Sequence, residues 1–126
     1  MRAYRYDHLH LRSPDPEKAA AFYTGLLGAT EKARLDNNGA LRIVLDLGGV
    51  TVFVEQVPAA TPVPPPAPFV GIEHIGLVVD DIAAAIEELR GQGVAILAEP
   101  KQIKPGLSIA FIGGPDGVRI ELLERK

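Results

Sequence analysis

The sequence predicts an α+β fold in which one βαβββ unit occurs twice in tandem. Two strand-like stretches each carry a histidine near the start, His8 and His74, and they lie 66 residues apart. Each stretch runs into an acidic helix cap, and each helix precedes three further strand-like stretches separated by glycine turns. At 126 residues the chain has room for one domain made of two such modules, at about 4–57 and 71–124.

The first module opens with an alternating strand over residues 4–12, in which His8, His10 and Arg12 share one face. Asp15 can cap the helix that follows, because its carboxylate can accept from the first free backbone N–H groups. Three more strands are expected at 30–36, 41–47 and 50–57. Asn-Asn-Gly and Gly-Gly stand between them and accept positive φ cheaply, so both are predicted hairpin turns.

The two modules are joined by a segment, residues 58–68, that holds six prolines in eleven positions. Proline stiffens the chain and removes backbone donors, so the segment predicts an extended linker with a reach of roughly 30 Å at ~3.1 Å per residue. In the second module we expect a strand at 72–79 and a helix through Arg90, capped by Asp80 or Asp81. Its remaining strands are predicted at 94–98, 107–112 and 118–123.

Composition narrows the class of function. The formal net charge of -3 does not indicate a nucleic-acid partner. No apolar run approaches the ~20 residues that cross a bilayer, and no signal core follows Met1, so we expect no membrane partner and a cytoplasmic location. The chain has no cysteine, which leaves His, Asp and Glu as its strong metal ligands.

A metal site is predicted from three residues. His8 and His74 occupy equivalent positions of the repeat, and Glu121 stands among Ile, Leu and Leu on the last strand. A carboxylate in that setting costs free energy unless it is paired or bound to a cation. Two imidazoles and one carboxylate make a facial set for a divalent ion. The alternative is that the histidines are ordinary surface residues and that Glu121 pairs with Arg119.

Three segments resemble the vicinal oxygen chelate superfamily, which includes glyoxalase I, methylmalonyl-CoA epimerase, fosfomycin-resistance enzymes, extradiol dioxygenases and bleomycin-binding proteins. They are His-Ile-Gly-Leu-Val-Val-Asp-Asp at 74–81, Phe-Tyr-Thr-Gly-Leu-Leu-Gly at 22–28 and Gly-Pro-Asp-Gly-Val-Arg-Ile-Glu-Leu at 114–122. The resemblance implies paired modules that form a curved mixed sheet around a central cavity with a metal. It places His8, His74 and Glu121 at the family's ligand positions.

The fourth family position lies on the last strand of the first module, where glyoxalase I usually has a glutamate. The repeat register puts Phe53 there, with Glu55 two residues further on the same face. Either the site has three protein ligands, or a bulge lets Glu55 reach the metal. This departure weighs against a strict glyoxalase I assignment.

The resemblance and the ligand set together predict a glyoxalase-like, metal-dependent lyase or isomerase that acts on a small carbonyl substrate. The metal would chelate vicinal oxygens and stabilise an enediolate. Glu121 or Glu55 would act as the base. His10 is either a substrate contact or proton carrier, or a histidine that faces solvent or only supports the ligands. The ion could be Zn, Ni, Mn or Fe. Alternatives are an extradiol dioxygenase, a fosfomycin-type thiol transferase or a non-catalytic drug-binding protein.

Modules of this kind pair within one chain or across a dimer. On the resemblance we expect a homodimer with two sites and a small-molecule substrate. If pairing is across the dimer, His8 of one subunit meets His74 and Glu121 of the other. Arg12, Arg42 and Arg119 are either contacts for an anionic substrate group or surface charges.

Overall fold

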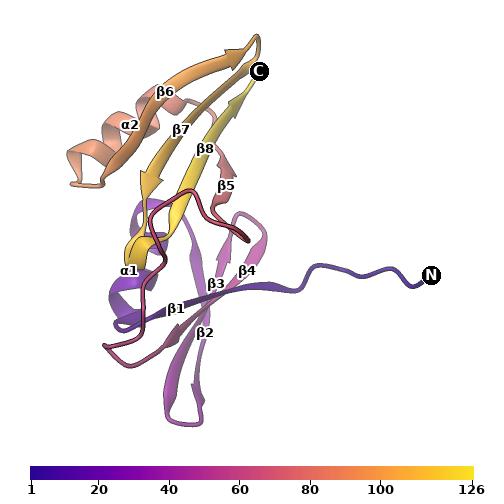
Figure 1. Cartoon of the computed structure of the whole chain (residues 1–126), viewed down its shortest axis with the longest axis vertical. Coiled ribbons are helices and arrows are strands. Elements are labelled where there is room, and N and C mark those ends of the chain that lie inside the picture. The colour runs from indigo at the N-terminus through magenta and orange to yellow at the C-terminus, as the bar shows by residue number, and fades with distance from the viewer. The chain divides into compact units, whose positions relative to one another are not determined.

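A computed structural model describes all 126 residues, and the chain divides into two compact units, residues 1–62 and 63–126 (Figure 1). Each unit contains one predicted module and repeats the order strand, helix, strand, strand, strand. The first unit holds β1 (His8–Ser13), α1 (Pro16–Leu26), β2 (Thr30–Asn37), β3 (Ala40–Leu47) and β4 (Val50–Gln56). The second holds β5 (Ile75–Val78), α2 (Ile82–Gly91), β6 (Ile96–Lys104), β7 (Leu107–Gly113), a 3-10 turn (Pro115–Gly117) and β8 (Arg119–Arg125). The predicted α+β class with two βαβββ modules is confirmed.

The two sheets have the same topology. Their strand orders are β1-β4-β3-β2 and β5-β8-β7-β6. The first and last strands of each unit pair in parallel, and the other neighbours pair antiparallel. A parallel pair needs a crossover between its strands, and in each unit the crossover contains the helix. Both sheets are therefore mixed, as predicted.

Each helix begins where the sequence predicts. Asp15 accepts a hydrogen bond from the backbone N–H of Lys18, and Asp81 accepts one from Ala84. Of the two cap candidates in the second module, Asp81 is the one that caps. The hairpin turns also match: Asn38 and Gly39, and then Gly48 and Gly49, all have positive φ.

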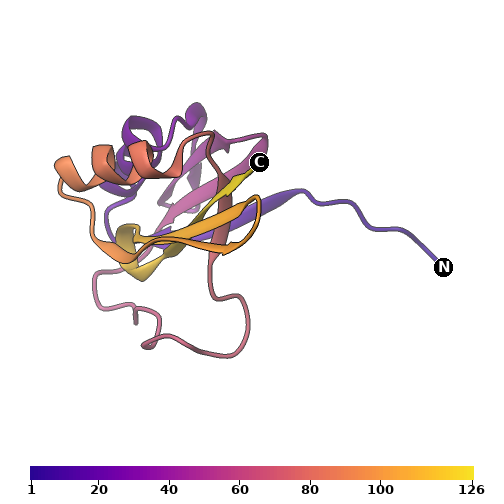
Figure 2. The ribbon, with the colours of Figure 1, turned by 90° about the horizontal axis from the view of Figure 1, so that it is seen from above.

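Each helix covers one face of its own sheet, and the alternation of each strand puts apolar side chains on that face. In the first unit, the buried apolar residues of β3 and β4 are Ile43, Leu45, Leu47, Val52 and Val54. In the second, those of β7 and β8 are Ala110, Ile112, Ile120 and Leu122. Figure 2 shows α2 lying across its sheet. The face turned away from the helix carries the polar residues of interest in both units.

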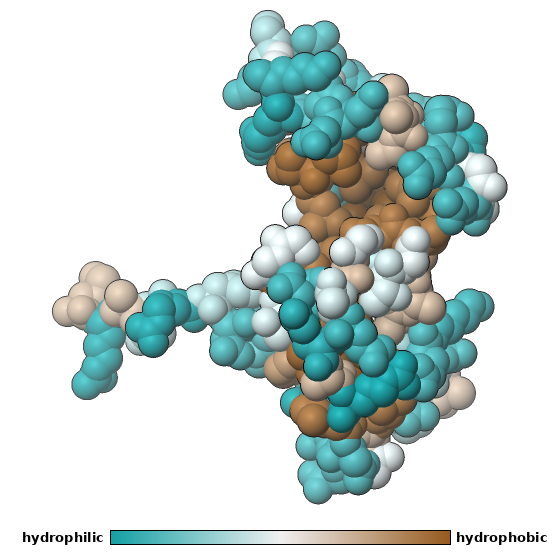
Figure 3. All heavy atoms as spheres, turned by 180° about the vertical axis from the view of Figure 1, so that it is seen from behind, coloured by the Kyte–Doolittle hydropathy of each residue, from teal (hydrophilic) through white to brown (hydrophobic).

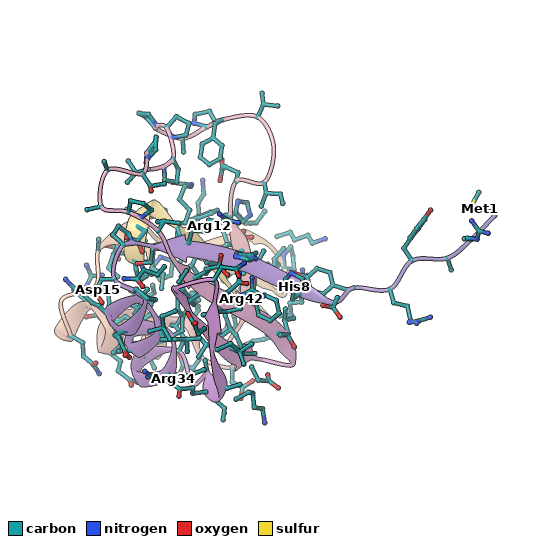
Figure 4. The ribbon with its side chains drawn as sticks, turned by 90° about the horizontal axis from the view of Figure 1, so that it is seen from below. Met1, His8, Arg12, Asp15, Arg34 and Arg42 are labelled. Atoms are coloured by element: carbon teal, nitrogen blue, oxygen red, sulfur yellow. The ribbon has the colours of Figure 1, made fainter.

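Two strand predictions were wrong at their starts. Residues 4–7 form no strand, because the pairing of β1 with β4 begins at His8 and Thr51. This segment extends from the sheet toward Met1 (Figure 4). In the second unit β5 begins at Ile75 rather than 72, because its partner β8 begins only at Arg119, after the 3-10 turn. His74 therefore lies just before a strand instead of within one.

β6 differs at both ends: it begins at Ile96 and runs to Lys104, although the sequence predicts a strand at 94–98. The register between β6 and β7 shifts between Ala98 and Lys101, around Pro100. Pro100 has no backbone N–H to donate to the neighbouring strand. It also interrupts the alternation of apolar and polar residues on which a strand prediction relies. A hairpin turn at Pro105 and Gly106 follows; Gly106 has a φ of 82°.

The segment 58–68 contains neither helix nor strand, as predicted. Val57, which precedes the segment, and Pro64, within it, each contact their own unit. The N–H of Val57 donates to the carbonyl of Ser13 at 3.0 Å in the first unit. In the second, the ring of Pro64 lies where a Cβ on Gly117 would point, with Cδ 3.1 Å from that position.

The surface is mixed in character. In Figure 3 hydrophobic residues gather in the upper half of the view, over elements of the second unit, and hydrophilic residues cover the outer edges. No helix in the chain has the length and apolar character needed to cross a membrane.

Candidate metal centre

The second unit brings together two of the three predicted ligands. β8 alternates, so Ile120 and Leu122 are buried under α2 while Glu121 lies on the opposite face. Its Oε1 is 3.3 Å from Nε2 of His74. Gly76 pairs with Glu121 in the sheet, and a Cβ on Gly76 would lie 3.7 Å from Oε1. The glycine therefore leaves open the space beside the carboxylate.

The other ring nitrogen of His74 is also engaged. Nδ1 lies 2.9 Å from Oε1 of Glu73, and the same oxygen accepts a hydrogen bond from Nε of Arg119 at 3.1 Å. The guanidinium of Arg119 lies 4.9 Å from the ring centre of Phe111, and the rings of His74 and Phe111 are nearly perpendicular with centroids 5.1 Å apart. The hydrogen bond from His74, with that from Arg119, lowers the pKa of Glu73, so this residue is ionised near neutral pH.

His74 thus lies between two carboxylates. A neutral imidazole has a single N–H and can donate to only one of them. If Nδ1 carries the proton toward Glu73, the lone pair of Nε2 faces an oxygen of Glu121. A second proton or a cation bound by Nε2 and Oε1 makes both contacts attractive. This donor pair, with one nitrogen and one carboxylate oxygen, fits a divalent ion.

In the first unit His8 has the same kind of neighbour. Its Nδ1 lies 2.6 Å from Oδ2 of Asp7, the preceding residue. Its ring stacks on Phe53, with centroids 4.2 Å apart and planes 22° apart. Figure 4 shows His8 at the start of β1, with Arg12 further along the same strand.

The strand register confirms that Phe53 holds the position of Glu121. Phe53 pairs with His10 on the first strand of its unit, as Glu121 pairs with Gly76. Where the second unit has a glycine and a carboxylate, the first has a histidine and a phenyl ring. The first unit therefore presents no carboxylate at this position.

Glu55 lies two residues further along β4 and is 8% exposed. Its Oε1 accepts from Nε of Arg42 at 2.6 Å and from Nδ2 of Asn37 at 3.1 Å, and Nη2 of Arg42 is also 2.6 Å away. The hydrogen bond from Arg42, more than any other contact, lowers the pKa of Glu55. Arg42 in turn lies 4.8 Å from the ring centre of Phe53. These partners hold Glu55 as a structural anion.

His10 completes this group. Its Nε2 is buried, has no hydrogen-bond partner and lies 3.8 Å from Oε1 of Glu55. Burial is the main cause of a lowered pKa, partly offset by the charge of Glu55. An uncharged imidazole nitrogen without a partner can accept a proton or a hydrogen bond from a bound molecule.

The structure thus brings His74 next to Glu121 in one unit, and His10 next to Glu55 in the other, which also holds His8. No three His, Cys, Asp or Glu side chains come together as a metal-sized group. Arg42 and Arg119, predicted as either anion contacts or surface charges, are paired with Glu55 and Glu73. Arg12 is exposed on β1.

Sequence reasoning missed Asp7 and Glu73, the acidic neighbours of the two histidines. The sequence does contain an indication of them, because an acidic residue directly precedes the histidine in both repeats. The contact was not expected, because adjacent residues of a strand point to opposite faces and both pairs were predicted to lie in strands. Asp7 and Glu73 both lie outside the strands, and this frees them to reach the ring that follows.

Comparison with known proteins agrees with this architecture. The chain is 33% identical over 130 residues to human mitochondrial methylmalonyl-CoA epimerase, covering 94% of this chain and 72% of that protein. It is 32% identical over 129 residues to the lactoylglutathione lyase of Salmonella typhimurium, covering 94% and 91% of the two chains. A shorter match, 45% over 56 residues, covers 44% of this chain but only 16% of a probable chloroplastic lactoylglutathione lyase of Arabidopsis thaliana.

The fold is shared with solved structures. A glyoxylase/bleomycin resistance protein/dioxygenase domain from Frankia sp. EAN1pec superposes with a TM-score of 0.81 at 18% identity, over 99% of this chain and 100% of that one. Residues 5–122 match the family model described as Glyoxalase/Bleomycin resistance protein/Dioxygenase superfamily. The chain belongs to this superfamily.

Proposed function

We propose that this protein is a metal-dependent lyase or isomerase of the glyoxalase type, which moves a proton on a carbon next to a carbonyl group. The observation that carries the proposal is the pair formed by His74 and Glu121, whose nitrogen and oxygen face each other at 3.3 Å beside the glycine at 76. The relatives named lactoylglutathione lyase and methylmalonyl-CoA epimerase support it.

The proposed ligands are His74, Glu121 and His8, the last supplied by the same chain or by a second copy in a homodimer. A divalent ion bound there supplies Lewis acidity to neighbouring oxygens of a small substrate. Phe53 provides no fourth donor, and Arg42 and Asn37 hold Glu55. The contacts therefore support the set of three protein ligands over a set that includes Glu55.

The proton-transfer candidates remain Glu121, His10 and Glu55. Glu55 is the weakest of them, because its hydrogen bonds stabilise the ionised form and reduce its basicity. His10 presents a buried nitrogen without a partner, on the face of β1 that also carries His8. We propose His10 as the residue that exchanges a proton with the substrate, with Glu121 as the ligand that orients the ion.

Elemental analysis of the purified protein tests the ligand assignment. We expect about one divalent ion per chain, since a site of this kind holds a single ion. His74→Ala is expected to abolish binding, and His10→Ala, which removes a histidine outside the ligand set, is expected to retain it. Full metal retention in His74→Ala would refute the assignment.

A substrate screen tests the reaction. The metal-loaded enzyme is incubated with the hemithioacetal of methylglyoxal and glutathione, and separately with methylmalonyl-CoA. Lyase activity is followed by formation of lactoylglutathione, and epimerase activity by exchange of the α-hydrogen with deuterated water. The absence of both reactions in a metal-loaded protein would exclude these two substrates. Mass measurement in solution tests the proposed homodimer.

A further inference from the structure

Each proposed ligand histidine is preceded by an acidic residue that contacts the same ring atom. Asp7 approaches Nδ1 of His8 at 2.6 Å, and Glu73 approaches Nδ1 of His74 at 2.9 Å. The contact recurs in both units although the residue type and the position of the strand start differ. In both units the ring nitrogen that does not contact the preceding acidic residue is Nε2.

The geometry points to a positioning role for Glu73, with Asp7 as its counterpart: each fixes the proton of its histidine on Nδ1 and so presents Nε2 as a metal donor. This inference rests on the proposed function. A histidine that ligates through one nitrogen is held in its tautomer by the hydrogen bond of the other, and a carboxylate partner also raises its basicity as a ligand.

The side chain of Glu73 is held in place more firmly than that of Asp7. The Glu73 side chain is 25% exposed and is anchored by Arg119, which itself lies over Phe111. Asp7 is 88% exposed and lies in the extended segment before β1, where water competes for its oxygens. The loss of Glu73 is therefore expected to have the larger effect of the two.

The contact is also the only one that holds the His74 ring on its Nδ1 side. Because β5 begins at Ile75, the backbone of residue 74 is not fixed by the sheet ladder. The phenyl of Phe111 packs nearly perpendicular to the His74 ring but offers no hydrogen-bond acceptor. Without Glu73 the imidazole is free to place its proton on Nε2 and donate to Glu121, which would occupy the donor atom that a metal needs.

The test uses the full chain in two measurements. Long-range ¹H–¹⁵N spectra of the metal-free protein at mildly basic pH report the tautomer of each histidine. Competition of Zn²⁺ with a chromophoric chelator reports affinity. We expect the wild type to hold His74 with its proton on Nδ1. In Glu73→Ala that preference is expected to disappear, with Zn²⁺ affinity falling about 10- to 100-fold.

Three variants separate positioning from general damage to the fold. Glu73→Asp keeps a carboxylate, as Asp7 does in the first unit, and is expected to recover most of the affinity. Asp7→Ala is expected to lose less than Glu73→Ala. Glu99→Gln removes an exposed ion pair with Arg90 in the same unit and is expected to leave both readouts unchanged. Thermal unfolding of each variant confirms that it is folded.

The outcomes distinguish this inference from the proposed function. Wild-type Zn²⁺ affinity and tautomer in Glu73→Ala would overturn the inference and leave the metal site intact. If the wild type binds no ion of any kind, the proposed function falls. The tautomer spectra then decide alone whether Glu73 positions His74: an Nδ1 proton lost in Glu73→Ala supports it, and an unchanged spectrum overturns it.

Discussion

Phe53 and Glu121 occupy the same position of the strand register in the two units, one as a phenyl ring stacked on a histidine and the other as a carboxylate 3.3 Å from one. The repeat is therefore symmetric in backbone and asymmetric in chemistry. The asymmetry extends to the neighbouring strand, where His10 in the first unit corresponds to Gly76 in the second.

Phe53→Glu would restore a carboxylate beside His8. If the proposed site has three protein ligands, the added donor is expected to raise Zn²⁺ affinity about tenfold or more, which corresponds to ~1.4 kcal/mol. Chelator competition measures it. Phe53→Leu removes the ring without adding a donor and is the matched control. A gain of the same size in Phe53→Leu would show that relief of the stacking, not ligation, is responsible.

Gly76 sets the space beside Glu121. A Cβ at this position would make ordinary contacts, 3.4 Å to Cδ1 of Leu123 and 3.7 Å to Oε1 of Glu121, so Gly76→Ala is expected to change Zn²⁺ affinity by less than about threefold. The branches of Gly76→Val reach further and are expected to displace the carboxylate and weaken binding more than about tenfold. Valine suits a strand, so thermal stability should hold. Equal affinity in both variants would contradict this account.

Arg42 controls the pH dependence contributed by Glu55. Because the folded-state pKa of Glu55 lies below its ordinary value of 4.5, the pair stabilises the fold above that pH. The contribution is lost as pH falls through the lowered pKa. The difference in free energy of unfolding between wild type and Arg42→Ala should therefore be largest above pH 4.5 and shrink on acidification.

Urea unfolding from neutral pH down to about pH 3 measures this difference. Arg12→Ala, which removes an exposed arginine from β1, is the control and should show no comparable trend across the range. A constant difference between wild type and Arg42→Ala at every pH would mean that Arg42 acts through packing on Phe53 alone.

Asp81 caps α2, so Asp81→Ala leaves the N–H of Ala84 without its acceptor. We expect a loss of about 1 kcal/mol in the free energy of unfolding, in the range typical of such caps. Asp80→Ala, one residue earlier and also exposed, should change stability by less than about 0.5 kcal/mol. Chemical denaturation of both variants checks the contrast; equal losses would rule out the capping explanation.

Most of the local structure could be predicted from the sequence. The cap at Asp15, a cap at Asp80 or Asp81 and the turns at 38–39 and 48–49 were predictable because each depends on chemistry within four residues. The repeat also predicted the exchange of Glu121 for Phe53, since equivalent strands share one register.

Features that depend on a residue far away in the sequence were harder to predict from the sequence. The start of β5 follows from where β8 begins, and the length of β6 follows from its pairing with β7 across Pro100. Glu55 and Arg42 likewise lie on two different strands, and the sequence alone does not show which residues of those strands face each other. Glu73 was missed for a related reason: it lies outside β5, which begins at Ile75 and not at the predicted residue 72.

The N–H of Val57 donates to Ser13 and the ring of Pro64 lies close to Gly117, so the segment between Val57 and Pro64 has a contact with a unit at each end. Within the proline-rich segment the N–H of Thr61 donates to the carbonyl of Pro58 at 3.0 Å, so the segment turns there instead of running fully extended. Its reach is therefore shorter than the ~30 Å expected from eleven extended residues at ~3.1 Å each. A shorter tether raises the effective concentration of one unit near the other and narrows the set of partners each can reach. Lengthening it with glycine and serine therefore tests whether the proposed homodimer depends on the length of this segment.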